Sequence, residues 1–174
     1  MLTTVNEYKL LKVFFDCPEK SFHIRQLSRL TGISAPGILK ILKRLKKHDL
    51  LVVEKNGVTD NVRASKTDNF LRLKRFYNTE RLFETGLVDS LRDVYQEPEV
   101  IVLFGSYSRG EDISSSDIDI AIIAPKEREF SAEKFERTLK RKLNTYVIQT
   151  KTAKPEFLNS LANGIVLYGF LKVV

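Results

Sequence analysis

Asp117 and Asp119 are the residues of this 174-residue chain whose types and spacing point most directly to chemistry. They lie two apart in the apolar stretch 117–123, and side chains two apart on a β-strand point to the same face. Buried carboxylates are costly unless they are paired, hydrogen-bonded or metal-bound. The stretch contains no Lys or Arg, so Mg²⁺, which binds carboxylates, waters and phosphate oxygens, is the simplest expected partner.

A Gly-Ser pair precedes these acids, at the end of an apolar strand predicted over residues 100–104. Gly105 has no Cβ and lets the backbone approach a ligand closely, and the amides and hydroxyl of a Gly-Ser turn can hold a phosphate. A phosphate-binding turn that faces two carboxylates is the minimum equipment for nucleotidyl transfer assisted by Mg²⁺. The alternative interpretation is an edge strand with two solvated aspartates beside a hairpin loop.

The sequence Gly105-Ser106, ten further residues and then Asp117-Ile118-Asp119 resembles the signature of the minimal nucleotidyltransferases, whose fold is that of the catalytic domain of DNA polymerase beta. The resemblance covers roughly residues 99–171. It implies that Gly105 and Ser106 bind a nucleoside triphosphate and that Asp117 and Asp119 are catalytic and hold Mg²⁺ or Mn²⁺. Arg109 either adds positive charge to the phosphates or forms a salt bridge with Glu111 or Asp112.

One departure from that family concerns the next predicted strand, residues 143–148 (LNTYVI). Active members usually carry a third carboxylate there, which binds metal and helps to activate the attacking hydroxyl. Here Asn144 or Tyr146 stands at that place. A neutral amide can ligate a metal but is a poor base. This departure therefore makes catalysis less expected and favours a domain that binds a nucleotide without transferring it.

The first third of the chain carries the whole net charge. Residues 1–66 contain 13 Lys and Arg against 6 Asp and Glu, whereas residues 67–174 contain 16 of each. Predicted helices over 6–15, 25–30 and 35–47 and a hairpin turning at Asn56-Gly57 resemble a winged helix-turn-helix, which implies double-stranded DNA as a partner. The residues expected to meet bases or phosphates are Ser34, Ala35, Gly37, Lys40, Lys43, Arg44 and Lys47, with Lys55 and Arg63 on the hairpin. The alternative is a protein-docking module with a solvated Lys face.

The predicted fold class is α+β, in three segments: a winged helix-turn-helix domain (1–66), a helical linker (67–97) and a small nucleotidyltransferase domain with a mixed sheet flanked by helices (98–174). Asn78-Thr79 is the expected break within the linker. The linker is rich in large apolar residues, so it either packs on the nucleotidyltransferase core or forms a homodimer contact.

The single cysteine, Cys17, excludes an internal disulfide and a cysteine-cluster metal site. The chain shows neither a signal-peptide pattern nor an apolar run of membrane-spanning length, so we expect a cytoplasmic protein without a membrane partner. Three functions fit. The first is an active nucleotidyltransferase that moves a nucleoside monophosphate onto a protein or small molecule, such as an antitoxin that modifies a partner toxin. The second is a transcription regulator with a degenerate, nucleotide-binding domain, and the third is a structural pairing of two domains.

Overall fold

The computed structural model describes residues 4–56, 59–148 and 155–172. It divides into two compact units, Met1–Lys74 and Arg75–Val174. Among the described residues, no helix combines the length and the apolar character that crossing a membrane requires.

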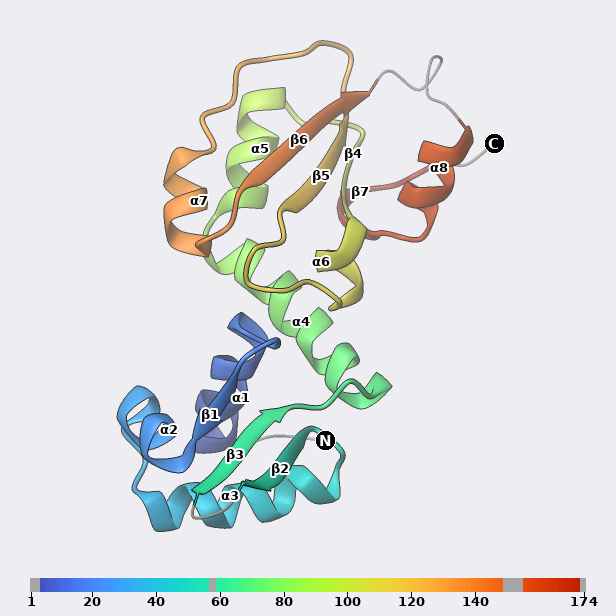
Figure 1. Ribbon diagram of the computed structural model, residues 1–174. Coiled ribbons are helices and arrows are strands. Elements are labelled where there is room, and N and C mark those ends of the chain that lie inside the picture. The colour runs from blue at the N-terminus through green and yellow to red at the C-terminus, as the bar shows by residue number, and fades with distance from the viewer. Residues whose placement is uncertain (1–3, 57–58, 149–154, 173–174) are drawn as a thin grey trace. The chain divides into compact units, whose positions relative to one another are not determined.

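The described part of the N-terminal unit consists of three helices, a small antiparallel sheet and the first turns of α4 (Asp68–Glu84) (Figure 1). In chain order its elements are α1 (Val5–Asp16), β1 (Ser21–His23), α2 (Ile24–Thr31), α3 (Ala35–Lys47), β2 (Leu51–Asn56) and β3 (Thr59–Ala64). The strands lie in the order β1-β3-β2. The core is made of apolar side chains from the three helices and β3, among them Leu10, Phe14, Leu27, Ile38, Leu42 and Val62. The predicted turn at Asn56-Gly57 lies partly outside the described residues.

An ion pair joins two helices of this unit. The side chain of Glu7 closes the capping box of α1 by accepting a hydrogen bond from the backbone of Thr4 (2.8 Å). Its other oxygen lies 3.2 Å from the guanidinium of Arg44 on α3, and the Glu7 side chain is only 3% exposed. Because a buried carboxylate needs its partner, Arg44 stabilises the fold of this unit.

The C-terminal unit is built on a four-stranded mixed sheet. It begins within α4 (Asp68–Glu84), at Arg75. The elements that follow are α5 (Leu87–Tyr95), β4 (Val100–Phe104), α6 (Gly105–Arg109), β5 (Ile118–Ile123), α7 (Glu133–Leu139), β6 (Leu143–Ile148), α8 (Pro155–Ala162) and β7 (Ile165–Gly169). The strand order is β6-β5-β4-β7, and β5 and β6 are parallel while the other pairs are antiparallel. The expected α+β class and the mixed sheet flanked by helices are confirmed.

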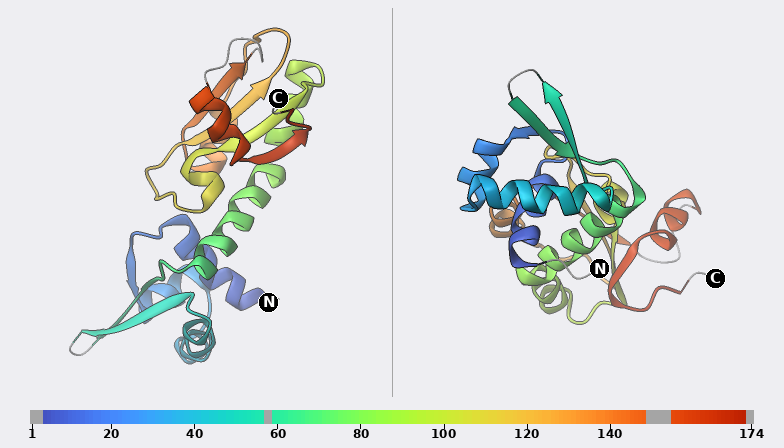
Figure 2. Two further views of the ribbon diagram at one scale, coloured as in Figure 1. Left: turned by 90° about the vertical axis from the view of Figure 1, so that its right-hand side faces the viewer. Right: turned by 90° about the horizontal axis from the view of Figure 1, so that it is seen from below.

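Helices cover the two faces of this sheet unequally, and the left view of Figure 2 shows α5 and α8 on opposite sides. On one face, α5, α7 and the end of α4 pack onto a large apolar core that includes Leu82, Leu87, Leu91, Ile101, Ile120 and Phe135. The apolar residues in the second half of the predicted linker, from Leu82 to Tyr95, therefore pack on the sheet of this unit, whereas Phe76 and Phe83 are exposed. On the other face, α8 covers a smaller cluster that includes Val102, Ala121, Ile148 and Leu161.

The linker does not break where the sequence suggested. Helix α4 runs through Asn78-Thr79 to Glu84, and the break falls at Gly86, which adopts a φ of 72°. Asn78 is buried, and its side-chain amide donates hydrogen bonds to the backbone oxygen of Tyr107 (2.9 Å) and to Asp112 (2.8 Å). The prediction was wrong because Asn78 serves this long-range network rather than ending a helix.

Candidate active site

The strand register brings together residues that are distant in the sequence. Asp119 on β5 lies opposite Phe104 on antiparallel β4 and opposite Asn144 on parallel β6. Since side chains alternate along strands, these three residues share the sheet face that packs against α8. Asp117 directly precedes β5 and lies two residues from Asp119, so both acids are near the same end of the sheet.

The backbone conformation at position 105 and its closeness to Asp119 require a glycine there. Its φ is 74°, and a Cβ added at this position would lie 2.7 Å from Oδ2 of Asp119. Any other residue would be strained and would displace the carboxylate. The predicted tight turn is a short helix, α6, whose first turn is closed by a hydrogen bond from Ser108 Oγ to the Gly105 carbonyl (2.8 Å).

Asn144 links the two acids. Its side-chain nitrogen donates to Oδ2 of Asp117 at 3.3 Å and to Oδ1 of Asp119 at 3.1 Å. The structure thus places Asn144 beside the carboxylate pair, at the position where the family resemblance implies a third acid. Among the described residues there is no group of three or more Asp, Glu, His or Cys side chains that could hold a metal ion.

Tyr146 is the second side chain of β6 at this site. Its ring lies 5.5 Å from that of Phe104, and its hydroxyl interacts with Asp119. Partial burial and the negative charge of Asp119 raise the pKa of the Tyr146 phenol. The phenol is therefore a protonated hydrogen-bond donor at neutral pH, and it cannot replace the missing acid as a base.

Ser106 and Arg109, the remaining predicted nucleotide contacts, lie on α6. Within the described part of the chain, the hydroxyl of Ser106 makes no hydrogen bond, so it can accept a ligand. Arg109 forms a salt bridge of 2.7 Å with Glu111, and both side chains are about half exposed. An exposed pair contributes about 0–1 kcal/mol, so this pairing does not prevent the guanidinium from turning toward a phosphate.

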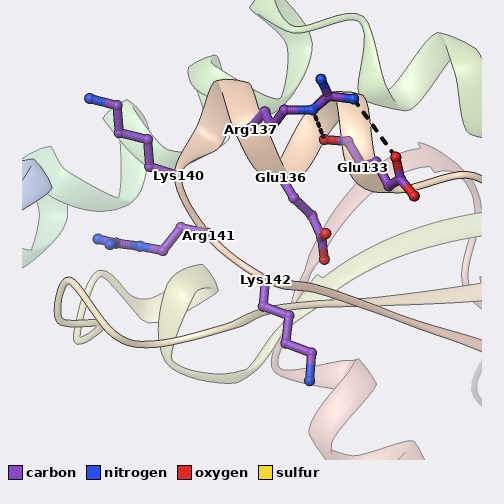
Figure 3. Close-up of a pocket in the computed structure, with 6 residues that line it drawn as sticks. All are labelled: Glu133, Glu136, Arg137, Lys140, Arg141 and Lys142. Atoms are coloured by element: carbon purple, nitrogen blue, oxygen red, sulfur yellow. Dashed lines mark hydrogen bonds and ion pairs between the residues drawn. The ribbon is translucent and has the colours of Figure 1, made fainter.

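A pocket of about 490 Å³ lies at the turn from α7 to β6 (Figure 3). It is lined by Glu133, Glu136, Arg137, Lys140, Arg141 and Lys142. Its acids already have partners, because Glu133 lies 3.7 Å from Arg137 and Glu136 accepts a hydrogen bond from the backbone of Leu143. The nearly buried Arg141 lies 3.6 Å from Asp112, which is 1% exposed, so this pocket belongs to the scaffold that supports the site.

The predicted DNA-contacting residues occupy one helix and one hairpin of the N-terminal unit. Ser34 is the N-cap of α3 and accepts a hydrogen bond from the backbone of Gly37, and Ala35 and Gly37 form the first turn. Lys40, Lys43 and Lys47 are exposed on α3, and Lys55 is exposed on β2. Arg44 is paired with Glu7, and Arg63 is paired with Glu54 at 2.5 Å. The contact between Arg44 and Glu7 was not readable from the sequence, because it joins positions 37 residues apart.

A family of known proteins matches the C-terminal unit in sequence. Residues 88–170 match the family model described as Polymerase beta, Nucleotidyltransferase. A curated relative, the protein adenylyltransferase MntA of Shewanella oneidensis, is 44% identical over 45 residues, which are 26% of this chain and 32% of that protein. The chain therefore spans about a third of the length of that relative.

Two solved structures are also similar. One, of the toxin–antitoxin pair MntA–HpeT in a mutant form, is 26% identical with a TM-score of 0.42, and the other, of a toxin–antitoxin with AMP-PNP, is 28% identical with a TM-score of 0.42. Each match covers 50% of this chain and 73% of the other. The family match shows that the C-terminal unit contains a nucleotidyltransferase domain of the polymerase beta type.

Proposed function

We propose that the C-terminal unit transfers a nucleoside monophosphate from a nucleoside triphosphate to a protein acceptor. The observation that carries this proposal is the packing of Gly105 against Asp119, with Asp117 and Asn144 alongside. This arrangement juxtaposes a backbone suited to phosphates with the carboxylates that would hold a cation.

The donor set fits Mg²⁺ or Mn²⁺. Asp117 and Asp119 supply carboxylate oxygens on one side of the sheet, and Asn144 offers an amide oxygen once its side chain rotates. Mg²⁺ commonly uses one or two carboxylates and completes its shell with water and phosphate oxygens, so two acids suffice for binding. Asp117 and Asp119 would hold the cation, which would supply positive charge to offset the negative charge that develops at the α-phosphate as pyrophosphate leaves.

Other residues of the site would bind the phosphates of the nucleotide. The Gly105 backbone and the Ser106 hydroxyl bind the β- and γ-phosphates, and Arg109 adds a positive charge beside them. Asn144 cannot take up a proton from the attacking hydroxyl. General-base assistance contributes roughly 10²–10⁴-fold to such reactions, so we expect slow transfer.

ATP and a protein hydroxyl are the substrates to test first, because the curated relative is named a protein adenylyltransferase. The resemblance to minimal nucleotidyltransferases, which often act as antitoxins, makes a partner toxin the first acceptor to examine. Incubation with α-labelled ATP, Mg²⁺ and the product of the neighbouring gene should label the acceptor. The variant Asp117→Asn with Asp119→Asn should abolish the label.

A second function is favoured by one observation, the amide of Asn144 beside the acid pair. A domain without a third acid could bind a nucleotide and report it without transferring it. Binding of Mg²⁺ and ATP without transfer to any acceptor would support this sensor over the enzyme. Absence of nucleotide binding would contradict both.

For the N-terminal unit we propose a winged helix that binds double-stranded DNA, with α3 in the major groove and the hairpin of β2 and β3 against the backbone. The support is the order of its elements, the net charge of +7 over residues 1–66 and the exposed Lys40, Lys43 and Lys47 on α3. The variant with all three lysines changed to Ala should lose at least tenfold in DNA affinity, with a shallower salt dependence. Arg44 is left unchanged because it also pairs with Glu7, and unchanged affinity would contradict DNA binding by α3.

A further inference from the structure

A pocket of about 470 Å³ lies between α6 and α8. It is lined by Phe104, Gly105, Ser108, Arg109, Asn159, Ser160 and Asn163. Its size falls within the range of pockets that bind small molecules, about 300–1,000 Å³. None of the residues named above for binding phosphate or metal lies on its α8 wall.

The pocket is lined by two residues that also neighbour Asp119. Gly105 lines it and also contacts Asp119, since a Cβ on Gly105 would lie 2.7 Å from the Asp119 carboxylate. Phe104, which also lines the pocket, is the register partner of Asp119. A ligand that places a phosphate at Gly105 can therefore extend into this pocket without crossing the sheet.

Helix α8 is held firmly enough to form a wall. At its end, Gly164 approaches β4 so closely that a Cβ would lie 2.6 Å from the backbone oxygen of Leu103. Earlier in α8, the ring of Phe157 packs edge-on against Phe104 with 5.4 Å between centroids. These two contacts fix the helix against the sheet and set the width of the pocket.

The α8 wall is polar and uncharged. In the part of the chain that the structure describes, the side-chain amide of Asn159 makes no hydrogen bond. Asn163 donates to the backbone of Asn159 (2.8 Å), which leaves its amide oxygen as an acceptor, and the hydroxyl of Ser160 donates to the backbone of Glu156 (3.1 Å), which leaves its oxygen lone pairs. This wall presents both donors and acceptors, whereas a wall for phosphates would present cations.

We propose that this pocket binds the nucleoside part of the donor nucleotide, with Asn159, Ser160 and Asn163 hydrogen-bonding to the sugar and base. The proposal rests on the function proposed above and adds the residues that recognise the nucleoside. Among the lining residues that the structure describes, Arg109 is the one cation, and it lies on the α6 wall. Phosphates therefore belong at the α6 end of the pocket and the uncharged nucleoside along α8.

Calorimetry with two probes, MgATP and magnesium tripolyphosphate, separates the nucleoside from the phosphates. The wild-type protein should bind MgATP more tightly than tripolyphosphate. The variant Asn159→Ala with Ser160→Ala should weaken MgATP binding by about tenfold and leave tripolyphosphate binding unchanged, because only the neutral hydrogen bonds to the nucleoside are lost. Both positions are exposed in a helix, where Ala is well tolerated, and Glu156→Gln on the same helix but outside the pocket is the matched control.

Each other outcome overturns the proposal in an identifiable way. Equal weakening of both probes would show that α8 binds phosphates, and no weakening of either would show that α8 takes no part. If wild-type protein bound tripolyphosphate and MgATP equally, the phosphate site would stand and the nucleoside site would not exist. If it bound neither probe, the proposed function itself would fail.

Discussion

The two faces of the C-terminal sheet differ in how completely apolar side chains cover them. The face under α5 and α7 is closed by an almost wholly apolar cluster. The face under α8 has a smaller cluster, and toward one end its residues change to Phe104, Asp119 and Asn144. One face therefore supplies stability, while the incomplete cover of the other leaves polar side chains accessible to a ligand.

The largest expected effect is on the closed face. Leu91 on α5 is fully buried, so Leu91→Ala should lower the free energy of unfolding by about 3 kcal/mol. On the open face, Asp119→Asn should change it by less than about 0.5 kcal/mol or raise it, because one of two neighbouring negative charges is removed. Urea titration followed by circular dichroism compares the variants. Equal losses would show that the two faces contribute alike.

A smaller effect on stability, with a larger one on binding, is expected at Gly105. The variant Gly105→Ala should cost about 2 kcal/mol because of the positive φ, and its Cβ should displace Asp119 and abolish MgATP binding. Gly86→Ala is the matched control, since Gly86 has a φ of 72° but nothing within 4 Å of an added Cβ. The control should lose stability and keep binding, and retained binding in Gly105→Ala would contradict the role of this contact.

A loss of stability no larger than that of Gly105→Ala is expected at Asn144. The variant Asn144→Asp removes the amide that donates to both acids and adds a third negative charge, so without metal it should lose about 1–2 kcal/mol. With Mg²⁺ the same variant should be stabilised more than the wild type, since three carboxylates bind a divalent cation better than two. Melting curves with and without Mg²⁺ measure this. An equal Mg²⁺ shift in both proteins would argue against Asn144 facing the metal site.

Much of this arrangement could be predicted from local patterns. The alternation of residues 117–123 placed both acids on one face, and the helix over 35–47 with its Ser34 cap has the predicted bounds. The Gly-Ser pair was predicted as a turn but begins α6, because a φ > 0 glycine can precede a helix as readily as it closes a turn.

The rest depends on contacts between distant residues. Asn78 resembles a helix breaker in sequence, yet it satisfies a buried carboxylate 34 positions away. The polar residues of α8 carry no motif, and only the pairing of β4 with β7 and the close approach of Gly164 bring them beside Gly105. A single sequence does not record such long-range packing.

The thermal stability of the protein with Mg²⁺ and ATP together tests whether a nucleotide binds at Asp117 and Asp119. A ligand that binds only the folded state stabilises it by an amount set by its concentration relative to Kd, about 2.7 kcal/mol at 100 times Kd. We expect a rise in Tm for the wild-type protein with both ligands. We expect no such rise for Asp117→Asn with Asp119→Asn, which should fold like the wild type. An equal rise in both proteins, or none in the wild type at saturating ligand, would contradict a nucleotide site at the carboxylate pair.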